Sequence, residues 1–166
     1  MRRVLQELHD DFIAGSYRGD PVGMDRDKIC TLTRAVSRGL GLSGLGSAYI
    51  STRALKHAYE RRPASEYQLI LDRLHSLVKR PTQIYQNKPG KRGSHLLVGM
   101  LNDQEYACTI EIVTETEIEI VTVFEKRDKY FEPGKGCVLL WSWGDGTTSH
   151  RIALDADESQ STSNPQ

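Results

Sequence analysis

One histidine among arginine and lysine residues is the pattern in this chain best suited to acid–base chemistry. His57 follows Arg53 by four residues and Lys56 by one, so in a helix Arg53 lies one turn from His57. Histidine exchanges protons near neutral pH, and fixed cations stabilise charge on a phosphate. Such a group can cleave RNA without a metal, because a base removes the 2′-hydroxyl proton and an acid protonates the leaving 5′-oxygen. A solvent-facing helical histidine is the alternative interpretation.

The charges of the chain are sorted along the sequence. The whole chain has 22 basic and 22 acidic residues, but the stretch from Arg53 to Arg92 holds ten basic and three acidic ones. This asymmetry is typical of an anion-binding face opposite an acidic one. Two basic clusters could converge on His57, namely Lys79 with Arg80 and the turn that carries Lys88, Lys91 and Arg92. Solvated helices and a solvated turn are the alternative.

Other residues could contact a substrate. Tyr85 precedes the basic turn and could stack on a base or donate its hydroxyl to a phosphate. Thr122 alternates with apolar residues, so we expect it on one strand face with Ile118, Ile120 and Phe124. A core tyrosine and an ordinary strand threonine are the alternatives. We expect the pair Trp141 and Trp143 to share a sheet face as core or groove wall.

Several other chemistries have no motif in this sequence. It has no H-E-x-x-H, no paired C-x-x-C, no P-loop and no G-x-S-x-G. Gly39, Gly41 and Gly44 match G-x-G-x-x-G, but a helix is predicted before them and an extended segment after them. A dinucleotide site needs the reverse order. We therefore expect neither a metal nor a cofactor.

Composition favours a folded protein that does not enter a membrane. Of 166 residues, 38% are hydrophobic and 27% charged, and no apolar run is long enough to span a bilayer. The first residues become charged too early for a signal peptide. Three cysteines are too few for a disulfide framework, which favours a reducing, cytoplasmic setting.

Apolar spacing predicts an α+β domain with an N-terminal helical extension. Helices are predicted over 2–13 and 25–38, then a glycine-rich linker, then a helix from Ser51 and another from Pro63 to Pro81. Period-two segments follow, which predict strands over 82–85, 95–101 and 137–143 and two strands between. We expect two helices on one face of a four- to five-stranded antiparallel sheet. The predicted divisions are an extension and linker (1–46), the main domain (47–154) and a disordered polar tail (155–166).

Segments spread over residues 48 to 144 resemble one known family. They are ISTRALKH (50–57), RPASEY (62–67), PTQIYQNK (81–88), KRG (91–93), YACTIE (106–111), VTVF (121–124) and LLWSW (139–143). In this order they resemble a family of phage and prophage proteins in the barnase–EndoU–colicin–RelE-like (BECR) nuclease superfamily. The resemblance implies two helices on a four-stranded sheet and a metal-independent endoribonuclease. It implies catalytic roles for His57, Lys91 or Arg92, and Thr122. Substrate-binding supports would be Arg53, Lys56, Tyr85 and Lys88.

Three hypotheses follow from the sequence. The first is an endoribonuclease that leaves 2′,3′-cyclic phosphate ends on tRNA or mRNA, as a phage or mobile-element effector or toxin with a protein inhibitor as a further partner. The second is a nucleic-acid-binding module without catalysis. The third is an immunity or inhibitor protein that covers a basic partner with its acidic strands, through Glu111, Glu115, Glu117 and Glu119. Only the first predicts RNA scission that depends on His57.

Overall fold

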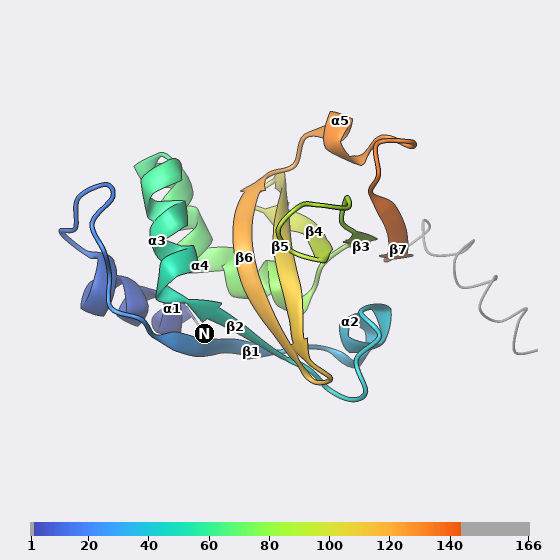
Figure 1. The fold of residues 1–166 in the computed structure, drawn as a ribbon, viewed down its shortest axis with the longest axis horizontal. Coiled ribbons are helices and arrows are strands. Elements are labelled where there is room, and N and C mark those ends of the chain that lie inside the picture. Colours follow the sequence, from blue (N-terminus) through green and yellow to red (C-terminus); the bar gives the residue numbers. More distant parts are fainter. Residues whose placement is uncertain (1, 144–166) are drawn as a thin grey trace, which may run out of the picture.

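A seven-stranded mixed sheet organises the chain (Figure 1). The computed structural model describes residues 2–143. In space the strands follow the order β1-β2-β6-β5-β4-β3-β7, with β2 and β6 parallel and every other neighbouring pair antiparallel. The strands are β1 (Arg26–Thr31), β2 (Ser47–Ser51), β3 (Gln83–Gln86), β4 (His95–Leu101), β5 (Gln104–Thr114), β6 (Glu117–Glu125) and β7 (Val138–Ser142).

Most of the helices cover one face of this sheet, and one short helix lies on the opposite face. They are α1 (Arg2–Leu8), the π-helix η1 (His9–Ile13), α2 (Arg34–Gly39), α3 (Thr52–Arg61), α4 (Ala64–Lys79) and α5 (Asp128–Phe131). Helices α1 to α4 and the facing strand residues share one large core. The opposite face carries a smaller cluster in which α5 packs over Tyr85, Leu96, Val98 and Ala107. None of the helices in residues 2–143 is long and apolar enough to cross a bilayer.

The helical pair and most of the strands confirm the sequence prediction. Helix α3 ends before Pro63 and α4 ends before Pro81. The apolar stripe of α4 is entirely buried; it comprises Tyr67, Ile70, Leu71, Leu74, Leu77 and Val78. Asn102 and Asp103 form the expected turn between β4 and β5 with φ values of 52° and 66°, which is the backbone shape of a two-residue hairpin.

The predicted sheet was too small. The α+β class is confirmed, but an antiparallel sheet of four to five strands with two helices is wrong, since seven strands form a mixed sheet. The helix predicted over 25–38 is wrong as well, because β1 occupies its first half and α2 its second. The spacing of Ile29, Leu32 and Val36 fits a helix, and all three are buried. They lie, however, in strand β1, in the connection after it and in the short helix α2, respectively. Pairing of β1 with the distant β2 overrides the local pattern.

The N-terminal segment shares the core of the rest of the chain. Leu5, Ile13, Ile29 and Val36 are at most 1% exposed and belong to the same cluster as α3, α4 and the central strands. The one sheet and the one large core thus run across the predicted boundary at residue 46. The tail predicted over 155–166 lies outside the described residues.

A β-bulge in β6 reverses the predicted facing of Thr122. Ile110 pairs with Ile120 while Thr109 pairs with Thr122, so Val121 is an extra residue on β6. Ile118, Ile120 and Val123 consequently face the large core, whereas Phe124 packs in the smaller cluster on the opposite face. Simple alternation had predicted that Thr122 shares a face with Ile118 and Ile120. Because of the bulge it does not.

Truncation of Ile29 tests whether β1 supports the whole fold. We expect Ile29→Ala to lower the free energy of unfolding by about 2–5 kcal/mol, because the side chain is 0% exposed. Urea denaturation followed by circular dichroism measures this. Met24→Ala, at a side chain 77% exposed, is the matched control. If the N-terminal segment were an independent extension, unfolding of the remainder would be unchanged.

Candidate functional site

A pocket of about 430 Å³ brings together residues from four parts of the chain. Its walls come from the loop before β1, from α3 with the end of β2 that leads into it, from the β3–β4 loop and from β6. The lining residues are Gly19, Asp20, Met24, Ser51, Arg53, Ala54, Lys56, His57, Glu60, Arg92, Glu119, Ile120 and Val121. They include four of the eight predicted site residues, namely Arg53, Lys56, His57 and Arg92.

Helix α3 is held at both ends, which places His57 and Arg53 at the pocket. At its start the Ser51 hydroxyl accepts a hydrogen bond from the Ala54 N–H at 3.2 Å, which satisfies a helix-terminal donor. At its end the Arg62 guanidinium donates from Nε and Nη2 to the carbonyl oxygen of Val123, at 3.2 and 2.9 Å. The helix is thereby tied to β6 just beyond the bulge.

Lys56 lies under the loop before β1 rather than facing solvent. It is 5% exposed, and its Nζ donates to the Ser16 hydroxyl at 2.6 Å and to the Tyr17 carbonyl at 2.7 Å. The carboxylate of Glu60 lies 3.2 Å from the same Nζ. A hydrogen bond from the Gly19 N–H, together with Lys56, lowers the pKa of Glu60. Lys56, which the resemblance assigns to substrate binding, is therefore engaged by the loop and by Glu60.

The β3–β4 loop, which is held by hydrogen bonds, places Arg92 at the pocket. The buried Asn87 amide donates to the carbonyl oxygens of Arg92 and Gly93, at 3.2 and 2.9 Å. The Gly93 N–H donates to the Glu111 carboxylate at 2.9 Å. Gly93 has φ +83°, and a Cβ there would lie 2.9 Å from the Cβ of Thr109. Only glycine fits this position, so the loop is fixed against β5.

The environment of His57 favours its neutral form. His57 is exposed on the pocket wall. Partial loss of hydration there lowers the pKa of His57, and the positive charges of Arg61, Arg62 and Arg92 lower it further. Glu60 opposes this effect. A neutral imidazole at physiological pH is suited to accept a proton.

Two arginines at the pocket form no ion pair within residues 2–143, although Asp20, Glu60 and Glu119 also line it. Glu60 pairs with Lys56, and Glu119 pairs with Arg26 at 3.0 Å. No such ion pair engages Arg53 or Arg92 in the described part of the chain, and both are exposed. The pocket therefore offers an imidazole and two available guanidinium groups to an anionic ligand.

The other predicted site residues do not line this pocket. Lys91 is exposed in the same loop as Arg92, and Thr122 follows Val121, which lines the pocket. Tyr85 belongs to the cluster under α5, and Lys88 contacts Tyr130 of that helix. Tyr85 is 8% exposed and donates to the Gln83 side chain at 3.2 Å. The Nζ of Lys88 lies 3.8 Å from the centre of the Tyr130 ring.

Sequence reasoning missed the acidic side of the pocket. Asp20, Glu60 and Glu119 line it, but they lie on three segments that only the folded chain brings together. Glu60 could have been found, since it lies one turn after Lys56 on the same helix. Asp20 lies in a turn-rich segment that gave no sign of packing against α3.

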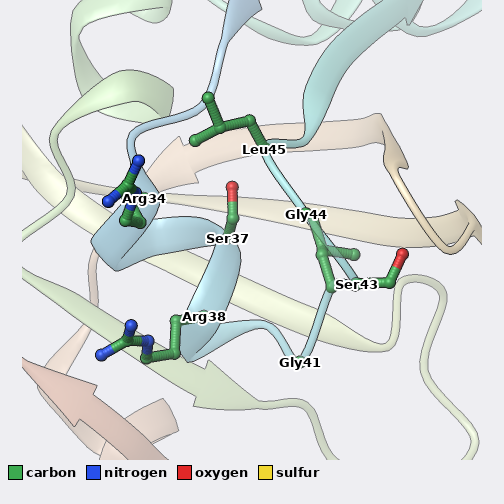
Figure 2. Close-up of a pocket in the computed structure, with 8 residues that line it drawn as sticks. Arg34, Ser37, Arg38, Gly41, Ser43, Gly44 and Leu45 are labelled. Carbon is green, nitrogen blue, oxygen red and sulfur yellow. The ribbon is translucent and has the colours of Figure 1, made fainter.

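The glycine-rich segment forms a separate pocket of about 510 Å³ beside α2. As predicted, a helix precedes it and strand β2 follows it. Figure 2 shows Ser37 between α2 and the loop, while Arg34 and Arg38 extend on the side away from Ser43 and Gly44. Its lining contains no histidine, cysteine or carboxylate. Within the described residues, no group of three or more histidine, cysteine or acidic side chains is placed to hold a metal ion.

Comparisons with protein-family models, with curated proteins and with solved structures give no match. The resemblance to the phage nuclease family therefore rests on the segments quoted above. Any functional conclusion has to come from the pocket itself.

Replacement of Lys56 tests its role in holding the loop before β1. We expect Lys56→Met to lower the free energy of unfolding by about 1.5–3 kcal/mol, because charged hydrogen bonds to Ser16 and Tyr17 are lost. Urea denaturation measures this, and limited proteolysis should show cleavage within residues 14–24. Lys129→Met, at an exposed position on α5, serves as control. Equal stability of the two variants would contradict the assignment.

Removal of one cation should shift one histidine and leave another unchanged. Arg92 lowers the pKa of His57, whereas Arg73 lowers that of His75. We therefore expect Arg92→Gln to raise the pKa of His57 alone and Arg73→Gln to raise that of His75 alone. NMR titration of the imidazole signals measures both. An unchanged pKa of His57 in Arg92→Gln would contradict the placement of Arg92 beside His57.

Proposed function

We propose that the protein is a metal-independent endoribonuclease whose active site is the pocket around His57. The observation that carries the proposal is the meeting of His57 and Arg53 from α3 with Arg92 from the β3–β4 loop. The pocket volume of about 430 Å³ falls in the range typical of ligand sites. The lowered pKa of His57 and the available charges of Arg53 and Arg92 suit a phosphodiester substrate.

In the proposed reaction the neutral His57 is the base. An imidazole nitrogen takes the proton of the ribose 2′-hydroxyl, and the 2′-oxygen then attacks the adjacent phosphorus. The bond from phosphorus to the 5′-oxygen breaks, and this oxygen takes a proton from solvent. The products are a 2′,3′-cyclic phosphate and a free 5′-hydroxyl. Arg53 and Arg92 stabilise the added negative charge of the five-coordinate phosphorus.

The other predicted residues take supporting roles in this proposal. Lys91, next to Arg92, contributes positive charge to the approach of the RNA. Thr122, next to Val121, is kept as a candidate for contact with the substrate. Lys56 positions the loop that forms one wall, and Tyr85 and Lys88 support the fold under α5. A phage or mobile-element effector remains the expected biological setting.

The competing hypotheses receive less support from the contacts. An acidic surface for a basic partner would draw on Glu111, Glu115, Glu117 and Glu119. Glu111 accepts the Gly93 N–H and Glu119 pairs with Arg26, so two of the four carboxylates already have partners within the chain. A binding module without catalysis has the same cations and is distinguished by experiment.

RNA cleavage in EDTA tests the proposed function. The purified protein should cut total tRNA or a labelled single-stranded RNA to fragments with 2′,3′-cyclic phosphate ends. We expect His57→Ala to lower the rate at least about 100-fold, as for loss of a positioned base, while a gel shift shows that RNA binding is retained. The rate should rise with pH through a midpoint below 6.5 and then level off, because the pKa of His57 is lowered from 6.5.

His75→Ala is the matched control for this assay. His75 is also a helical histidine with a lowered pKa, but it does not line the pocket, so its replacement should leave cleavage unchanged. RNA that stays intact yet shifts on the gel would favour the binding module. An equal loss of RNA cleavage in His57→Ala and His75→Ala would contradict the assignment of His57 as the catalytic base.

A further inference from the structure

A third cleft, of about 460 Å³, lies beside β7 at the edge of the sheet. It is lined by Thr33, Ala35, Val36, Lys79, Arg80, Pro81, Thr82, Trp141 and Trp143. Strand β7 is four positions from β6 in the sheet, or roughly 19 Å at the usual spacing of strands. This cleft is therefore distinct from the pocket around His57.

Two tryptophans form the aromatic wall of the cleft. Their ring centres lie 5.8 Å apart. Trp141 is 9% exposed and packs in the large core, whereas Trp143 is 64% exposed. The Trp143 N–H donates to the Thr82 carbonyl at 2.7 Å, so its backbone is fixed beside the junction between α4 and β3. The exposed indole of Trp143 is an available surface for stacking.

The charges of the cleft are of one sign. Among the described residues that line it, Lys79 and Arg80 are the ionisable ones. Within residues 2–143 neither forms an ion pair, and Arg80 is exposed. The pocket around His57 differs, because three carboxylates line it. Aromatic surface beside uncompensated cations matches a ligand with a flat ring and an anionic group.

We propose that this cleft binds a nucleoside phosphate, with the base stacked on Trp143 and the phosphate held by Arg80 and Lys79. The ligand is either a free nucleotide or one unit of a single-stranded RNA. In the second case the cleft is an additional contact for the substrate of the proposed nuclease, and the choice of RNA rests on that function.

Intrinsic fluorescence reports directly on this cleft, because the chain contains two tryptophans and both line it. We expect adenosine 5′-monophosphate to quench the emission in a saturable titration, excited at the red edge of tryptophan absorption. Adenosine should bind at least about ten-fold more weakly, since it lacks the phosphate. Inorganic phosphate alone should give no quenching.

Variants separate the two halves of the proposed site. Trp143→Leu removes the exposed fluorophore, so its affinity is measured by calorimetry; it should weaken binding of the nucleotide about 5- to 150-fold, the range for loss of one stacking aromatic. Arg80→Ala should weaken it about ten-fold. Arg73→Ala removes an exposed cation from the same helix without touching the cleft and should leave affinity unchanged. Equal binding of adenosine and the nucleotide, or no effect of Arg80→Ala, would overturn the proposal.

A short oligodeoxyadenylate distinguishes the two sources of the ligand. It lacks the 2′-hydroxyl, so it is not cleaved. Tighter binding than the mononucleotide assigns the cleft to a strand, and equal binding assigns it to a free nucleotide. No quenching by either would overturn the proposal. Quenching without any RNA cleavage would support nucleotide binding in the cleft and overturn the proposed nuclease activity. Cleavage without quenching would support the nuclease activity and overturn nucleotide binding in the cleft.

Discussion

The junction between β2 and α3 is the constraint on which the rest of the site depends. β2 ends at Ser51 and α3 begins at Thr52 without an intervening loop. The fully buried Thr52 hydroxyl donates to the Gly23 carbonyl at 2.6 Å and accepts the Asp25 N–H at 3.1 Å. Ser51 therefore caps the helix, and Thr52 holds the segment that enters β1.

The direction of β2 then decides where α3 goes. Because β2 runs parallel to β6 and its last pair is Ile50 with Ile120, the chain leaves the sheet at the level of the β6 bulge, and α3 continues beside β6 (Figure 1). The carbonyl oxygen of Val123, two residues beyond the bulge, accepts both hydrogen bonds from Arg62. The hydrogen bonds of Arg62 thus join the end of α3 to the irregular strand β6, and the pocket forms between these two elements.

Sequence patterns anticipated the parts of the fold that local chemistry determines. The stripe of α4, the proline boundaries and the Asn102–Asp103 turn depend on neighbours within a few residues. Three features could not be found in this way. Strand β1 exists because β2 is available to pair with it, the parallel β2–β6 contact joins distant segments, and the bulge at Val121 inserts one residue that no alternation rule foresees.

The site shows the same division between local and distant causes. His57, Arg53 and Arg92 could be selected because basic residues cluster around a histidine in one stretch of chain. The burial of Lys56 could not, because it is caused by Ser16 and Tyr17, which are distant in sequence. The placement of Tyr85 away from His57 likewise follows from the sheet order, which separates β3 from β6 by two strands.

The parallel pairing also bears on the order in which the chain is made. Ser51 precedes Glu117 by 66 residues, and at typical ribosomal speeds these take about 3–13 s to synthesise. Throughout that interval β2 lacks the neighbour that covers its inner edge, and the β6 wall of the pocket does not yet exist. A nascent chain can therefore carry His57, Arg53 and Arg92 without an assembled site, and translation itself delays the moment at which they come together.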